Sequence, residues 1–227
     1  MPPEVVLAAH GSRDPRAAAT IRQIAGAVGG TAAFLDFETP SLGTALRSAP
    51  RSIVVPLLLT PAYHARIDIP TVVDHARAEG ADVAVRTPLG TPDAVPALAQ
   101  ALDRRLPRVP LDAIVVAAAG SRDLAALEIV TDVAAALSRR RGLPASAGFA
   151  SGAGQSVFEA VSIHRQAGAA AVGLAMYFLA PGILPDRAVE QARTAGANVV
   201  AEPLGAAPEV VELIIERIAA PALVASQ

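Results

Sequence analysis

A pattern that occurs twice places the strongest constraint on how this chain folds. The first copy is a short apolar run at residues 5–9, followed by His-Gly-Ser-Arg-Asp. The second copy is an apolar run at residues 114–118, followed by Ala-Gly-Ser-Arg-Asp, and it begins 109 residues later. Two matching copies indicate a duplicated half-domain. We therefore expect the chain to form the same local structure twice.

Each copy has the residue order of a buried strand that leads into a helix. A continuous apolar run suits a parallel strand covered on both faces, and Gly11 permits the backbone angles of a sharp exit. Asp14 can accept a hydrogen bond from the open N–H groups of the next helix, and Pro15 fits its first position. His10 is therefore predicted at the carboxyl end of the first strand, the edge of an open parallel sheet where ligands bind.

Apolar runs, helical patterns and turn residues alternate through the first half of the chain. We expect strands near residues 4–9, 31–36, 51–58 and 81–86, and helices near 14–28, 40–49, 68–79 and 92–105. This alternation predicts a mainly parallel sheet, and the common strand order 2-1-3-4 makes strands one and three neighbours. The predicted fold class is α/β, with two duplicated lobes, each a mainly parallel sheet flanked by helices, and a cleft between them.

The repeat also divides the chain into two halves that differ in their histidines. We assign residues 1–108 to an N-terminal half that carries the histidine site and residues 109–227 to a duplicated C-terminal half. Ala119 stands in the second half where His10 stands in the first, and the second-half loop at residues 178–184 contains no histidine. The predicted chemistry is therefore confined to the first half.

Composition excludes several classes of site and partner. None of the 227 residues is cysteine, which excludes disulfides, thiolate metal sites and cysteine nucleophiles. All 19 basic residues are arginine, which excludes a P-loop lysine and a Schiff-base lysine. The net charge of −2 gives no general basic surface, so no nucleic-acid partner is expected. No apolar run has the length of a membrane span and no charged leader precedes the first strand, so we expect a cytoplasmic protein with no membrane partner.

Two histidines follow strands that the predicted order makes neighbours. His10 ends the first strand, and His64 lies in the loop after the third. Neutral imidazole binds borderline divalent ions such as Co²⁺, Fe²⁺ and Ni²⁺, and it can accept protons near neutral pH. Both histidines are absent from the second half, which favours a functional role for the pair. His75 and His164 lie within predicted helices, and we expect neither to reach the cleft.

Taken together, the motifs resemble those of the class II chelatases that act on sirohydrochlorin. The resemblance rests on His-Gly-Ser-Arg-Asp-Pro after the first strand, Pro-Leu-Leu-Leu-Thr-Pro-Ala-Tyr-His after the third and Leu-Ala-Pro-Gly near the end, and it covers nearly the whole chain. It implies a lyase that inserts Co²⁺ or Fe²⁺, with Ni²⁺ as a further candidate, into a tetrapyrrole of cobalamin or sirohaem biosynthesis, without an organic cofactor. The catalytic, metal-binding histidines of the family match His10 and His64.

Acidic and basic neighbours complete the site that the resemblance implies. The family commonly has an acidic residue after its second strand, and Asp36 and Glu38 are both candidates for that catalytic role. Guanidinium groups suit the carboxylates of an acidic substrate. The residues expected to bind the substrate are Ser12, Arg13, Tyr63 and Arg66.

Each of these assignments has a structural alternative. Arg13 and Arg66 could be solvated or paired with Asp14 and Asp68 instead of binding substrate. Ser12 could cap the first helix. The two acidic residues, Asp36 and Glu38, could begin the helix that follows Thr-Pro at residues 39–40.

Other functions also fit parts of the pattern. A non-catalytic metal carrier or tetrapyrrole-binding protein would use the same lobes and histidines without turnover. A histidine phosphatase usually has an arginine before its histidine, where this chain has Ala9. A bilobal solute-binding protein would need a signal segment. The sequence leaves open the metal, the pathway and whether the chain is a monomer or a homodimer.

Overall fold

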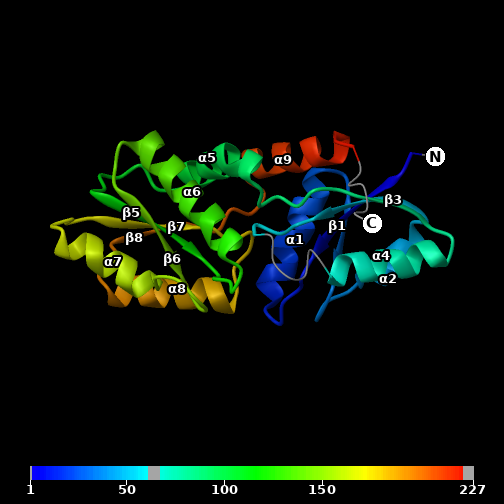
Figure 1. Cartoon of the computed structure of the whole chain (residues 1–227), viewed down its shortest axis with the longest axis horizontal. Helices are drawn as coiled ribbons and strands as arrows, with labels where there is room; N and C mark the ends of the chain where they lie inside the picture. Colours follow the sequence, from blue (N-terminus) through cyan, green and yellow to red (C-terminus); the bar gives the residue numbers. More distant parts are fainter. Residues whose placement is uncertain (1, 61–66, 222–227) are drawn as a thin grey trace. The chain divides into compact units, whose positions relative to one another are not determined.

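The computed structural model describes residues 2–60 and 67–221 of the chain. The chain divides into two compact units, each built on a four-stranded sheet (Figure 1). The first unit consists of Met1–Thr91 and Val211–Gln227, and the second consists of Pro92–Val210.

The sheet of the first unit is parallel throughout and has the order β2-β1-β3-β4. Its strands are β1 (Glu4–Ala9), β2 (Thr31–Phe34), β3 (Arg51–Pro56) and β4 (Asp82–Val85). The connecting helices are α1 (Pro15–Ala27), α2 (Leu42–Ser48) and α4 (Asp68–Ala78). Apolar side chains of α2 and α4, such as Leu46 and Val73, pack against Val6 and Val54 of the sheet. The predicted strand order is confirmed, with β1 and β3 as neighbours.

The second unit repeats this arrangement. Its strands are β5 (Ala113–Ala118), β6 (Ala145–Phe149), β7 (Val172–Met176) and β8 (Val199–Val200), all parallel in the order β6-β5-β7-β8. Helices α6 (Leu124–Arg141), α7 (Val157–Gln166) and α8 (Ile183–Thr194) connect them. All six residues of β5 are buried, as expected for a central strand covered on both faces. The predicted α/β class with two similar lobes is confirmed.

The compact units do not end where the sequence repeat ends. The short 3₁₀ helix η1 (Pro92–Ala94) and α5 (Val95–Arg105) belong to the second unit, although the repeat assigns these residues to the first half. Helix α9 (Pro208–Ala219) begins in the second unit and ends in the first. Within the second unit, Arg104 of α5 binds the buried carboxylate of Glu209 at 2.8 Å. The division at residue 108 therefore marks the two copies of the sequence repeat. As a boundary between domains it stays a prediction.

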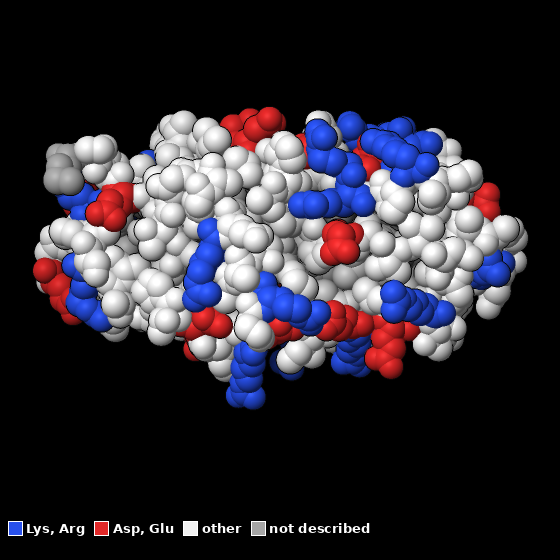
Figure 2. Space-filling view, turned by 180° about the vertical axis from the view of Figure 1, so that it is seen from behind, with Lys and Arg blue, Asp and Glu red and all other residues white. Residues whose placement is uncertain are grey.

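The surface carries charges of both signs. Figure 2 shows acidic and basic side chains mixed over one face, with wide uncharged areas between them. Within residues 2–60 and 67–221, no helix combines the length and the apolar character that a membrane crossing requires.

Candidate functional site

Strand β1 brings His10 to the carboxyl edge of the first sheet. The ladder between β1 and β2 continues past both strands: Leu35 N donates to Ala9 O at 3.0 Å, and Asp36 N donates to His10 O at 2.9 Å. These bonds fix His10 beside Asp36, as the sequence predicts for a strand end. Because His10 is only half-buried at this edge, its imidazole can reach a ligand.

The turn after His10 depends on a glycine. Gly11 has φ +95°, and a Cβ atom built on it would lie 1.9 Å from the carbonyl oxygen of Asp36. Gly120 makes the same turn in the second unit, where a Cβ atom would lie 1.8 Å from Ser151 O. The segment that leaves β1 lies so close to the segment that leaves β2 that no side chain fits at Gly11 without a shift of the backbone.

The start of α1 confirms one of the two capping predictions made from the sequence and contradicts the other. Asp14 is the N-cap, since its carboxylate accepts a hydrogen bond from Arg16 N at 2.9 Å, and Pro15 takes the first helical position. The alternative that Ser12 caps the helix is wrong. Its hydroxyl instead accepts a hydrogen bond from Asp14 N at 3.1 Å, which tightens the turn before the helix.

The two acidic candidates after β2 have different surroundings. The alternative that they begin α2 is wrong, because Ser41 is the N-cap and accepts a hydrogen bond from Thr44 N at 3.2 Å. Glu38 forms an ion pair with Arg22 of α1 at 3.0 Å. The carboxylate of Asp36 is exposed and has neither an ion pair nor a hydrogen bond to the part of the chain that is described. Asp36 is therefore the better placed of the two to act on a ligand.

Arg13 does not pair with Asp14. The Asp14 carboxylate is bound instead by Arg16, whose Nη2 lies 2.5 Å away, and hydrogen bonds from the side chain and backbone of Arg16 lower the pKa of Asp14. The guanidinium carbon of Arg13 lies 5.1 Å from the ring centroid of Phe37. That ring in turn meets the His10 ring edge to face, with centroids 6.5 Å apart and an interplanar angle of 85°. Arg13, Phe37 and His10 thus form one group.

Phe37 was not among the residues predicted from the sequence. A signal for it is present, because Phe37 directly follows the acidic candidate at the end of a strand in a chain with only 3% aromatic residues. The contact between Phe37 and His10 depends on the backbone conformation of the turn at Phe37. Composition and periodicity do not specify that conformation.

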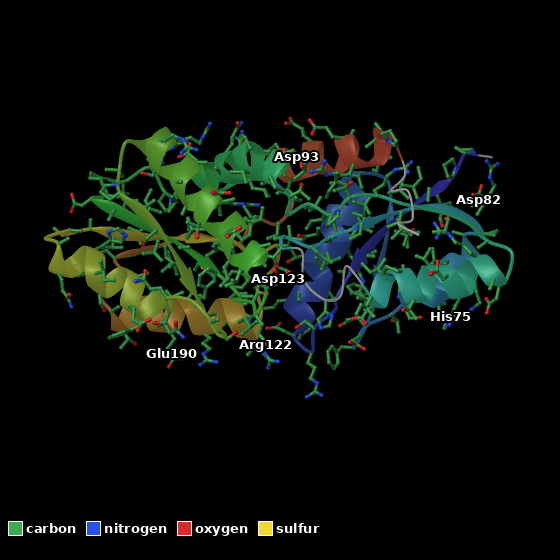
Figure 3. All side chains as sticks on the ribbon, viewed as in Figure 1. His75, Asp82, Asp93, Arg122, Asp123 and Glu190 are labelled. Carbon is green, nitrogen blue, oxygen red and sulfur yellow. The ribbon has the colours of Figure 1, made fainter. Side chains whose placement is uncertain are left out.

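The other two described histidines lie on helices, as expected. His75 is exposed on α4, where Figure 3 shows it, and it lines a hollow of about 550 Å³ formed mainly by α2 and α4. His164 lies on α7, with its Nε2 2.9 Å from the hydroxyl of Ser146, and burial lowers its pKa. Neither belongs to the strand-end group of His10.

The second predicted histidine, His64, lies outside the described residues, as do Tyr63 and Arg66. The structure shows how the preceding strand is held: β3 pairs with β1, and Leu57 N donates to Ala8 O at 2.8 Å. The pairing of His10 with His64 therefore stays a prediction. Over residues 2–60 and 67–221, no group of three or more histidine, aspartate or glutamate side chains is arranged to hold a metal ion.

The described residues bring an imidazole, a carboxylate and an aromatic ring to one open edge. Imidazole nitrogen and carboxylate oxygen are both ligands for first-row divalent ions, and both can accept protons. This edge therefore offers groups that can bind a divalent ion or accept a proton.

Comparison with known proteins gives a family match and a set of similar folds. The sequence model of the CbiX family matches residues 4–109 and again residues 113–220, so each half matches by itself. None of the curated proteins searched matches the chain.

The similar structures cover almost the whole chain. SirB from Bacillus subtilis with Fe³⁺ is 22% identical, with a TM-score of 0.79 over 96% of this chain and 95% of that one. The sirohydrochlorin chelatase SirB from Bacillus subtilis subspecies spizizenii in complex with cobalt is 21% identical, with a TM-score of 0.77 over 96% and 94%. CbiX, described as the terminal enzyme of siroheme biosynthesis in denitrifying bacteria, is 22% identical, with a TM-score of 0.65 over 95% and 98%. At this identity the likeness shows a shared fold.

The contact between Gly11 and Asp36 gives a prediction for stability. Gly11→Ala should lower the free energy of unfolding by at least about 2 kcal/mol, because the new methyl group meets a backbone oxygen and the positive φ disfavours alanine. Gly26→Ala in α1 is the matched control, since its Cβ meets nothing within 4 Å, and it should be neutral or stabilising. Urea unfolding of both variants is the measurement. Equal stability of the two variants would show that the strand exits do not constrain each other.

Proposed function

The chain belongs to the CbiX family of class II sirohydrochlorin chelatases, and we propose that it is a lyase that inserts Co²⁺ or Fe²⁺ into sirohydrochlorin during cobalamin or sirohaem biosynthesis. The observation that carries this proposal is the placement of His10 beside Asp36 at the open edge of the first sheet. The corresponding position of the second sheet has Ala119, whose carbonyl accepts a hydrogen bond from Ser151 N in the same way. The difference between the two edges indicates that the chemistry belongs to the first.

Metal insertion makes two demands that an imidazole meets. The incoming ion must be held after losing part of its water shell, and the two pyrrole N–H groups must lose their protons. The neutral imidazole of His10 can bind the ion loosely or accept a proton. His64, which follows the neighbouring strand, is the proposed partner in both tasks.

The acidic residue of the mechanism is assigned to Asp36. Its exposed carboxylate can accept a pyrrole proton or orient the ion, whereas the carboxylate of Glu38 is engaged by Arg22. Glu38 therefore has a structural task, which is to hold the loop after β2 against α1. Arg13 is exposed at the same edge, and its guanidinium group can meet the carboxylates around the macrocycle.

A carrier that binds the metal or the tetrapyrrole without turnover is the alternative. It would show equilibrium binding of either ligand but no metallated product. An anaerobic assay that follows the absorbance of sirohydrochlorin with Co²⁺, Fe²⁺ and Ni²⁺ separates the two functions and identifies the preferred metal.

The histidines give the first prediction for activity. His10→Ala should lower the rate of metal insertion at least about a hundredfold, because the variant loses an ion ligand and a proton acceptor at once. His75→Ala is the matched control and should keep the parent rate, since His75 is exposed on α4 outside the strand-end group. Unfolding curves of both variants should match the parent. A drop in rate that only follows a drop in stability would mean that His10 is structural.

The two carboxylates give the second prediction. Asp36→Asn should slow metal insertion about tenfold to a hundredfold, because the amide cannot take a proton or bind the ion as a carboxylate does. Glu38→Gln should keep the rate and lower the free energy of unfolding by no more than about 1 kcal/mol, as is usual for an exposed ion pair. Steady-state rates and urea unfolding test both variants. The opposite pattern would transfer the acidic role to Glu38.

A further inference from the structure

Phe37 has a backbone conformation that side chains rarely adopt. Its φ is +64°, and in the described part of the chain every other residue with positive φ is a glycine. Glu38 N donates to Asp36 O at 2.8 Å, so the chain closes a three-residue γ-turn around Phe37. A γ-turn with positive φ at its centre is rare and strained. The phenylalanine is therefore held at a cost in free energy.

At the corresponding position the second unit has a glycine with positive φ. Phe34 and Ser41 form an isolated parallel bridge in the first unit, and Phe149 and Ser156 form the same bridge in the second. Counting from these bridges, Phe37 corresponds to Gly152, whose φ is +78°. Glycine adopts this angle without strain. The first unit thus has a strained phenylalanine at a position where its duplicate has the residue best suited to the backbone.

Packing in the core does not account for Phe37. Its side chain is 58% exposed. Its ring contacts are the edge-to-face approach to His10 and the guanidinium group of Arg13, both of which belong to the candidate site. Strained residues that persist beside a reactive group are typical of functional sites.

We propose that Phe37 is a substrate-contact residue, and that the conjugated macrocycle stacks on its ring beside His10. This inference rests on the proposed function. Because 58% of Phe37 is exposed, its ring is accessible to a flat conjugated ligand, and offset stacking of such rings is favourable. The guanidinium group of Arg13 lies beside the same ring, where it can attract a carboxylate of the macrocycle.

The experiment measures binding apart from turnover. Sirohydrochlorin is titrated into the full chain without metal, and its absorbance gives the Kd; the KM and kcat for Co²⁺ insertion are measured in parallel. Phe37→Gly should raise both Kd and KM about fivefold to tenfold, the factor expected for one aromatic stack. The kcat should change less than about threefold, and stability should stay equal or rise because the strain is removed.

Two further variants make the result specific. Phe37→Tyr keeps the aromatic face and should bind like the parent. Phe158→Ala removes a different phenylalanine, 44% exposed on α7, and should leave Kd and KM unchanged.

Three outcomes would overturn the inference. The first is a Phe37→Gly variant that binds sirohydrochlorin as tightly as the parent, which leaves the proposed chelatase function intact. The second is a loss of binding in Phe37→Gly that is matched by a loss of stability, which would make the ring structural. The third is a parent chain that neither binds nor metallates sirohydrochlorin, which would overturn the proposed function as well.

Discussion

The site depends on the close contact between the chain leaving β1 and the chain leaving β2. One hydrogen bond joins Asp36 N to His10 O, and the backbone of Gly11 lies so near Asp36 O that no Cβ atom fits between them. Arg22 of α1 adds a second anchor, since it binds both the Glu38 carboxylate and the Thr39 carbonyl at 3.0 Å. Through these contacts the fold places the residues that carry an imidazole, a carboxylate and a phenyl ring next to one another at the carboxyl edge of the first sheet.

The duplication provides a comparison within one molecule. Both sheets have the same order, both first strands end in a glycine turn, and both glycines approach the backbone of the neighbouring strand exit. Three of the residues that differ lie at the strand exits: where the first unit has His10, Asp36 and Phe37, the second has Ala119, Ser151 and Gly152. Because the shared backbone satisfies the needs of folding in both units, the extra groups of the first unit are better explained by function than by stability.

Much of the fold could be predicted from sequence because its signals are local or repeated. Continuous apolar runs separated by turn residues identify buried parallel strands. The repeated Gly-Ser-Arg-Asp indicates that the two halves of the chain have the same fold. The partners of side chains could not be predicted, since they depend on which segments meet in space. The sequence allows Arg13 to pair with Asp14, but in the structure Arg16 binds Asp14 and Phe37 lies beside Arg13. A repeat in sequence also does not say which sheet a connecting helix covers, and the helix at residues 95–105 belongs to the second compact unit.

We propose that the metal enters at the His10 edge of the first sheet and not at the Ala119 edge of the second. Crystals of the full chain soaked anaerobically with Co²⁺, with anomalous data collected at the cobalt edge, test this most directly. We expect an anomalous peak within coordination distance of the His10 imidazole and none at the Ala119 edge. Cobalt held by residues of the second unit, with none at His10, would contradict it.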